Sequence, residues 1–296
     1  TGSTAHLTVS EVTITENDAI DGNGAGVYNS GAATLTITGS EFSDNNDSVD
    51  ATSNAYTALG NGGGVFNSDA NSIVTITGTD FVNNRAYRGG AVANVSEGNM
   101  TLTNVGIDDN TAIDDPDEFV NAGLGGGAYN SDDNTMMQIN FATLTKNGAV
   151  RGGGVANLSG ATLTIDSATI GGETGADANQ ALDNGDYTGA GEGGGVLNDS
   201  ETATITLTKT IIRNNNADDL GGGLSNKDGA LTMSRSLIAE NNARVGGGVY
   251  SAEGAVSLTN VTVSGNTSSA NNYGSAGITM FSNADTAGEG GQLTLH

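Results

Sequence analysis

Two short motifs that alternate along the chain constrain its fold more than any other feature. One motif is a glycine run followed by an aliphatic residue and then an asparagine, as in Gly62-Gly63-Gly64-Val65 with Asn67. The other is a hydrophobic residue followed three positions later by asparagine, as in Phe81 and Asn84. The pair of motifs recurs nine times, although the copy at Ile170 lacks its asparagine. Internal repeats of this size predict a solenoid, so we expect residues 1–296 to form one elongated domain.

The segment between the two motifs has the pattern of a half-buried strand. Leu35-Thr36-Ile37-Thr38 alternates apolar and polar residues, and Phe42 follows Ile37 by five positions. Alternation of this kind indicates a strand, and the constant offset indicates a second short strand after a fixed corner. With one more strand after each glycine run, the sequence predicts an all-β parallel β-helix. It should have about nine to ten coils, each with three short strands.

The asparagines that follow the glycine runs are predicted to have a structural role. Stacked amide side chains can hydrogen-bond from coil to coil as a ladder. The alternative interpretation of these residues is ligand binding. The predicted ladder comprises Asn29, Asn67, Asn94, Asn130, Asn157, Asn198 and Asn226.

Irregular segments are confined to one place in the repeat, between the second motif of one coil and the glycines of the next. The predicted loop insertions are about residues 46–61, 111–124, 171–192 and 267–275. Insertions at one corner of a solenoid emerge along one edge, which is often the edge that binds partners.

The charge balance restricts the possible partners. The chain has 34 acidic and nine basic residues, for a net charge of -25. Nucleic acid and anionic membrane surfaces need a basic face, so both are disfavoured. A simpler interpretation is that the charge keeps a β-rich surface soluble. No apolar run is long enough for a transmembrane helix, and the absence of Cys excludes disulfides.

One acidic insertion is the strongest candidate for a metal site. Asp114, Asp115, Asp117 and Glu118 lie within five residues, interrupted by the single proline. Calcium prefers several carboxylate and carbonyl oxygens, which a loop can supply. The alternative is a solvated acidic loop, and calorimetric titration with calcium distinguishes the two.

The paired motifs resemble the polymorphic outer-membrane-protein repeat, also written GGAI/FxxN. The closest matches are Gly89-Gly90-Ala91-Val92, Phe42-Ser43-Asp44-Asn45 and Phe81-Val82-Asn83-Asn84. The resemblance covers almost the whole chain and implies a right-handed parallel β-helix. Proteins with this repeat are typically secreted or exposed at the cell surface, and many are adhesins. The cysteines of that family are missing here.

Two function classes follow from a β-helix of this composition. The first is a non-enzymatic extracellular or cell-surface module, structural or adhesive, that binds surface glycans or proteins of a host or neighbouring cell. The second is a carbohydrate-active lyase or hydrolase, which would need a basic residue or a close set of carboxylates. His6 and His296 lie at the chain ends, and Arg85, Arg88 and Arg151 are expected to pair with acidic loops. We therefore expect the first class.

The chain starts and stops within a coil, which leads to two further expectations. It starts at Thr1 without a signal peptide, as a mature form or a fragment of a longer secreted passenger domain would. Open β-helix ends favour pairing with another chain. We expect self-association of subunits head to tail into a surface filament.

Overall fold

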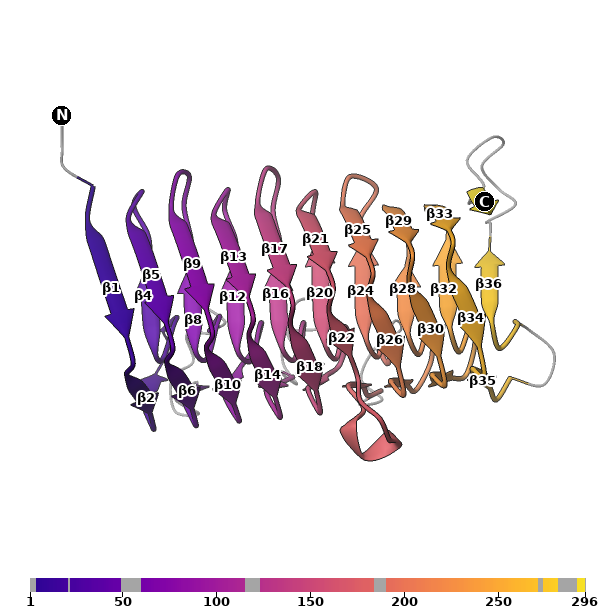
Figure 1. Ribbon diagram of the computed structural model, residues 1–296, viewed down its shortest axis with the longest axis horizontal. Helices are drawn as coiled ribbons and strands as arrows, with labels where there is room; N and C mark the ends of the chain where they lie inside the picture. Colours follow the sequence, from indigo (N-terminus) through magenta and orange to yellow (C-terminus); the bar gives the residue numbers. More distant parts are fainter. Residues whose placement is uncertain are drawn as a thin grey trace, which may run out of the picture.

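Four parallel sheets run side by side along an elongated rod (Figure 1). The computed structural model describes residues 4–20, 22–48, 60–114, 123–183, 190–270, 274–281 and 292–295. The chain is a right-handed parallel β-helix, so the predicted all-β fold class is confirmed. The prediction of three strands per coil is wrong, because each complete coil contributes one strand to each of four sheets.

Sheet A holds the longest strands and comes first in each coil. Leu35 and Ile37 point inward and are buried, whereas the threonines between and beside them face outward. The strands, all parallel and in register, are β1 (His6–Ser10), β5 (Thr34–Thr38), β9 (Ile73–Thr77), β13 (Asn99–Thr103), β17 (Met136–Asn140), β21 (Thr162–Asp166), β25 (Thr204–Thr208), β29 (Ala230–Ser234), β33 (Ala255–Thr259) and β37 (Gln292–Leu295).

Sheet B follows after a corner of two residues. The first corner residue has a left-handed backbone in every coil, with φ of 55° at Gly39 and at Asn104. This conformation turns the chain, and it is why the five-residue offset is constant. The strands are β2 (Thr13–Thr15), β6 (Glu41–Ser43), β10 (Asp80–Val82), β14 (Gly106–Asp108), β18 (Thr143–Thr145), β22 (Thr169–Ile170), β26 (Ile211–Arg213), β30 (Leu237–Ala239) and β34 (Thr262–Ser264).

Sheet C is the layer that the sequence interpretation missed. Its strands have two or three residues, and a single small residue such as Ala181 or Ala217 points inward. Such strands show no alternation, so the sequence predicts no strand at these positions: four of them fall within the predicted insertions and the other five in the shorter segments before the glycine runs. They are β3 (Asp18–Ile20), β7 (Asn46–Ser48), β11 (Arg85–Ala86), β15 (Thr111–Ala112), β19 (Gly148–Ala149), β23 (Gln180–Ala181), β27 (Asn216–Ala217), β31 (Asn242–Ala243) and β35 (Thr267–Ser268).

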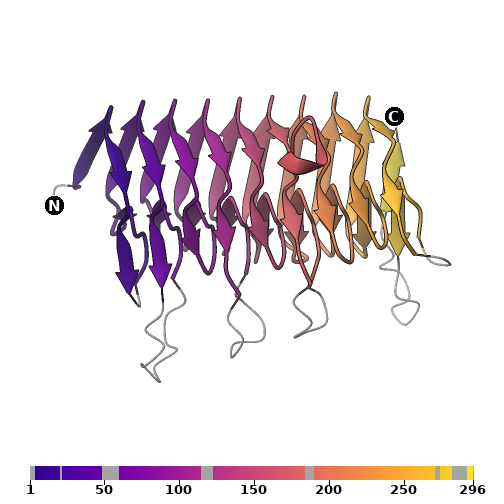
Figure 2. The ribbon, with the colours of Figure 1, turned by 90° about the horizontal axis from the view of Figure 1, so that it is seen from below.

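Sheet D follows the glycine runs and completes each coil. Its strands are β4 (Val27–Asn29), β8 (Val65–Asn67), β12 (Val92–Asn94), β16 (Ala128–Asn130), β20 (Val155–Leu158), β24 (Val196–Asp199), β28 (Leu224–Asn226), β32 (Val249–Ala252) and β36 (Ile278–Phe281). Its inward aliphatic column and those of sheets A and B form one continuous core, in which Phe42 and Phe81 stack with ring centroids 5.1 Å apart. Figure 2 shows the sheets from below, with each coil in register with the next.

Three of the four predicted insertions begin later than expected, whereas the segment 171–192 begins where the sequence predicts it. Residues 46–48, 111–112 and 267–268 are strands of sheet C, and Gln180–Ala181 divides the segment 171–192. Its first part, with the short 3-10 helix η1 (Gly175–Asp177), projects from the rod below β22 in Figure 1. Parts of each insertion, residues 49–59, 115–122, 184–189 and 271–273, lie outside the described residues.

Candidate functional site

The seven asparagines predicted as a ladder are joined by hydrogen bonds through the interior. Each Nδ2 donates to the Oδ1 of the next coil, from Asn29 to Asn226, over 2.7–3.0 Å. The series ends at the hydroxyl of Ser251, which accepts from Asn226. All seven side chains are buried. Their amides are therefore used to hold neighbouring coils together and cannot reach a ligand outside the rod.

A second ladder at the corner between sheets B and C was not assigned from the sequence. It comprises the asparagines of the second motif, with Nδ2–Oδ1 distances of 2.8–3.0 Å. Asn179 bridges Asn147 and Asn215 in it, so the coil that contains Ile170 does not lack its asparagine. The segment with η1 displaces that residue by several positions. The ladder residues are Asn17, Asn45, Asn84, Asn110, Asn147, Asn179, Asn215, Asn241 and Asn266.

Most of the predicted calcium loop falls outside the described residues, namely Asp115, Asp117 and Glu118. Asp114 is half-buried at the end of the described segment and takes part in an interaction there. Within the described ranges, no group of three or more His, Cys, Asp or Glu side chains could hold a metal ion. Nor does this part of the chain contain a helix long and apolar enough to cross a membrane.

A cluster of charged side chains lies on the outer side of sheet D. Arg151 donates from Nε and Nη2 to Oε2 of Glu192, over 3.2 and 3.0 Å, and it also pairs with Asp199. Lys227 Nζ lies 3.4 Å from the other Glu192 oxygen. Arg151 and Glu192 are only 8% and 2% exposed. The expected pairing of Arg151 with acidic residues is thus present.

Burial and charge compete in this cluster: burial lowers the pKa of Arg151, but the charges of Glu192 and Asp199 outweigh it and raise that pKa, whereas at Glu192 burial prevails. Burial raises the pKa of Glu192, although the charges of Arg151 and Lys227 act in the opposite direction. Burial also raises the pKa of Tyr250, to which Glu192 adds a repulsive contribution. The carboxylate of Glu192 contacts two cations and is almost inaccessible. The cluster can therefore stabilise the wall of the rod, but Glu192 is poorly placed to exchange protons with a large substrate.

Substituting Glu192 with Gln should alter how stability depends on pH. Since the pKa of Glu192 is raised above 4.5, the folded chain binds this proton more tightly than the unfolded chain does. The stabilising contribution is full below about pH 4.5 and is lost as pH rises through the folded-state pKa. The stability of the native protein relative to Glu192→Gln should therefore fall between about pH 4 and pH 7. Urea unfolding at both pH values measures this, with the exposed Glu97→Gln as control. If the stability of the native protein relative to Glu192→Gln instead rose between these pH values, the raised pKa of Glu192 would be contradicted.

The outer face of sheet A is the most extended and uniform surface of the rod. Its central column pairs residue for residue through ten strands and is exposed or half-buried throughout. Eight of its ten residues are threonine, and the other two are Gln138 and Ser257. The threonines are Thr8, Thr36, Thr75, Thr101, Thr164, Thr206, Thr232 and Thr294. Hydroxyls of neighbouring coils also bond to each other, as Thr204 does to Thr162 over 3.2 Å.

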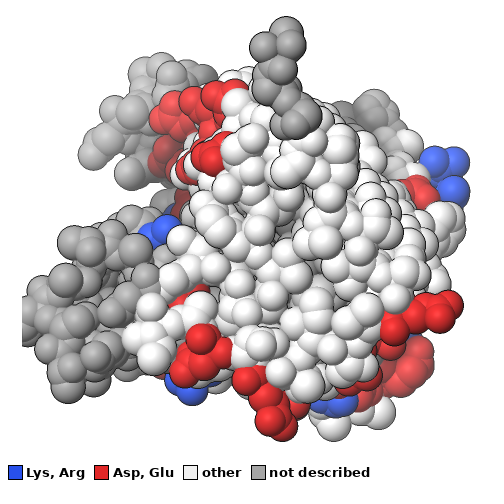
Figure 3. Space-filling view, turned by 90° about the vertical axis from the view of Figure 1, so that its left-hand side faces the viewer, with Lys and Arg blue, Asp and Glu red and all other residues white. Residues whose placement is uncertain are grey.

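This face is almost without charge, although the chain is strongly acidic. Among the outward-facing positions of the ten strands, Asp166 is the single acidic residue, and none is Lys or Arg. In the end-on view of Figure 3, acidic side chains form separate groups at the rim, with uncharged surface between them. The result is a long strip of hydroxyl and methyl groups that a polar polymer can approach without charge repulsion.

No protein-family model matches the chain, and no curated protein does. Two solved structures are similar to it: the Dettilon tailspike protein, at 13% identity with a TM-score of 0.34, and QnrB1, a plasmid-mediated fluoroquinolone resistance protein, at 9% identity with a TM-score of 0.30. The matches cover 99% of this chain in each case, and 60% and 92% of the two other chains. The chain thus spans about three fifths of the tailspike chain that it matches.

Proposed function

We propose that this chain is a non-enzymatic extracellular module that adheres to surface glycans through the outer face of sheet A. The observation that carries the proposal is the uncharged threonine array, which continues over ten strands. The resemblance of the repeat to the GGAI/FxxN adhesin family supports the same role and a location at the cell surface.

The chemistry of the array suits a polysaccharide. Each threonine offers a hydroxyl that donates and accepts hydrogen bonds, next to a methyl group. Neighbouring strands lie about 4.8 Å apart, and outward residues along one strand recur at about 7 Å. A polymer that repeats its own hydroxyls can therefore contact several coils at once. Such contacts are weak one by one, but their linkage in a single ligand raises the overall affinity.

Lysines introduced into the central column test this assignment. Beads coated with the protein should be retained under flow on films of cellulose or chitin. The double variant Thr75→Lys/Thr206→Lys should lower retention about tenfold or more, because each long side chain holds the film away from the face. The matched control is Thr143→Lys/Thr262→Lys, which adds the same charges to exposed positions of sheet B. If native beads are not retained, or if both variants lose retention equally, the proposal is wrong.

The non-enzymatic part of the proposal has its own test. Incubation with acidic polysaccharides should yield neither unsaturated products nor new reducing ends. Appearance of either would instead identify a lyase or a hydrolase.

A further inference from the structure

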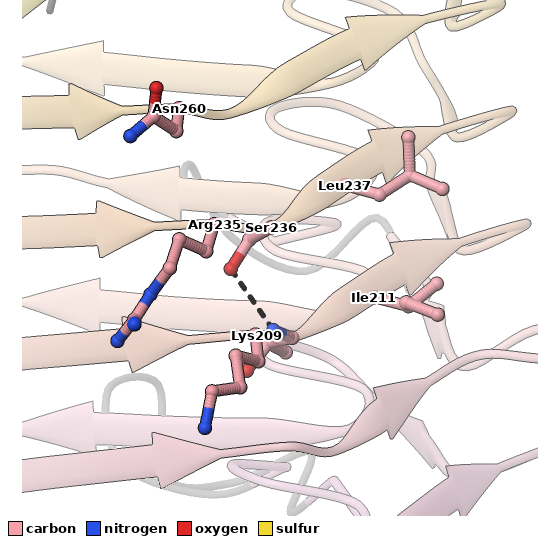
Figure 4. A pocket seen from close by; sticks show the side chains of 7 residues that line it. Lys209, Ile211, Arg235, Ser236, Leu237 and Asn260 are labelled. Atoms are coloured by element: carbon pink, nitrogen blue, oxygen red, sulfur yellow. Dashed lines mark hydrogen bonds between the residues drawn. The ribbon is translucent and has the colours of Figure 1, made fainter.

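A shallow hollow lies at the corner between sheets A and B, over the seventh to ninth coils. It is lined by Lys209, Thr210, Ile211, Arg235, Ser236, Leu237 and Asn260. Figure 4 shows the Lys209 and Arg235 side chains extending to the same side of the hollow. Ile211 and Leu237 lie on the opposite side, where they are paired in register on β26 and β30. The hollow therefore has a cationic side and an apolar side.

The two cations form no ion pair with the part of the chain that the structure describes. Five other basic residues form ion pairs with carboxylates: Lys146, Arg151, Arg213, Lys227 and Arg244. Neither Lys209 nor Arg235 pairs with a carboxylate of the described residues. Asp166 pairs in register with Thr208, the residue before Lys209. Its carboxylate accepts a hydrogen bond from the Ser167 hydroxyl and does not pair with Lys209. Two adjacent cations with no carboxylate partner among the described residues create a local positive site on a strongly acidic rod.

Local folding does not require basic residues at these positions. Lys209 and Arg235 occupy the left-handed corner position in successive coils, with φ of 49° and 51°. Gly39, Gly78 and Asn104 occupy the same position in other coils, and glycine and asparagine adopt this conformation at least cost. Both cationic side chains are exposed. Since the fold does not need these two basic side chains, they are available to bind a ligand at the surface of the rod.

The apolar side and the backbone of the hollow complete a preformed site. Ile211 is 37% exposed, and the outward positions equivalent to it in the first two coils are Thr13 and Glu41. The hydroxyl of Ser236 accepts a hydrogen bond from the Thr210 backbone N–H over 3.0 Å and donates to the carbonyl of Ser234 over 2.7 Å. These bonds fix the backbone of the corner, so Lys209 and Arg235 start from equivalent positions in successive coils.

We propose that this hollow binds an anionic sugar unit, a uronate or a sulfated sugar, within a surface glycan. The carboxylate or sulfate would bind the Lys209 ammonium and the Arg235 guanidinium, which are strong partners for such groups. The C–H face of the sugar ring would pack on Ile211 and Leu237. The inference rests on the proposed glycan adhesion, because the hollow adjoins the sheet A face. Nucleic acid and anionic membranes fit worse, since their charge extends over the acidic remainder of the rod.

Binding of soluble oligosaccharides at low ionic strength tests the inference. Alginate oligosaccharides carry carboxylates, and carrageenan oligosaccharides carry sulfates. The native protein should bind at least one, and Lys209→Gln/Arg235→Gln should weaken that binding about tenfold. The control Arg85→Gln/Lys146→Gln removes the same charge from other faces and should leave binding unchanged. Retention on cellulose or chitin films should be the same for all three proteins.

The outcomes separate this inference from the proposed function. If neither oligosaccharide binds, or if the control variant loses affinity equally, the proposed anionic-sugar site is wrong. In that case, retention on neutral films would still support adhesion through sheet A. If the oligosaccharides bind as expected but no film retains the native protein, the sheet A proposal fails and the corner site stands alone.

Discussion

Replacing Asn110 with alanine is expected to lower the free energy of unfolding by about 5 kcal/mol, because several buried polar groups lose their partners at about 1–3 kcal/mol each. Oδ1 of Asn110 accepts from the backbone N–H and the side-chain amide of Asn84, both over 2.9 Å. Its Nδ2 donates to the carbonyls of Phe81 and Asp108 and to Oδ1 of Asn147, each over 3.0 Å. The residue is completely buried, so water cannot replace these bonds.

The exposed Asn99→Ala is the matched control for this loss. Asn99 is also an asparagine of the fourth coil, but it faces outward from sheet A. Its replacement should change stability by less than about 0.5 kcal/mol. Urea unfolding followed by circular dichroism measures both variants, and amide hydrogen exchange shows whether the coils next to Asn110 open first. Equal unfolding midpoints for the two variants would show that the second ladder does not stabilise the rod.

Three of the four sheets could be predicted from the sequence because their strands carry a readable pattern. Sheet A alternates apolar and polar residues, sheet B follows at a constant offset, and sheet D follows the glycine runs. Sheet C was missed because its strands are too short to alternate. A weaker signal was present, since an Asn-x-Ala triplet recurs at this corner, as in Asn84-Arg85-Ala86 and Asn215-Asn216-Ala217. The same triplet at Asn179-Gln180-Ala181 identifies the displaced ladder residue.

The interaction surfaces were harder to predict than the fold. The charged cluster draws on three successive coils, with Arg151, Glu192, Asp199 and Lys227 as its members, and an inserted segment separates Arg151 from Glu192 along the chain. Their proximity therefore depends on the register of sheets that only the folded rod defines. The threonine column is visible in each strand separately, but its continuity over ten coils follows from the residue-for-residue pairing of sheet A.

Alanine at Gly153 is expected to disrupt the rod locally and to cost more than about 4 kcal/mol, a loss reached only when core or backbone geometry fails. An added Cβ would meet the backbone oxygens of Gln180 and Gly194 well inside 3.0 Å, a separation that real Cβ atoms essentially never show. Both oxygens belong to the next coil. They cannot move away without separating paired strands of sheets C and D.

The same coil supplies the control, because a Cβ added at Gly148 has no neighbour within 4 Å. Gly148 lies in β19 and its φ is not in the left-handed region, so alanine fits both sterically and conformationally. Since alanine also restricts the unfolded chain, Gly148→Ala should stabilise the protein by about 0.4–1 kcal/mol. Thermal and urea unfolding of the two variants measure the contrast. If Gly153→Ala were as stable as Gly148→Ala, close approach of the coils would not be the reason for glycine at this corner.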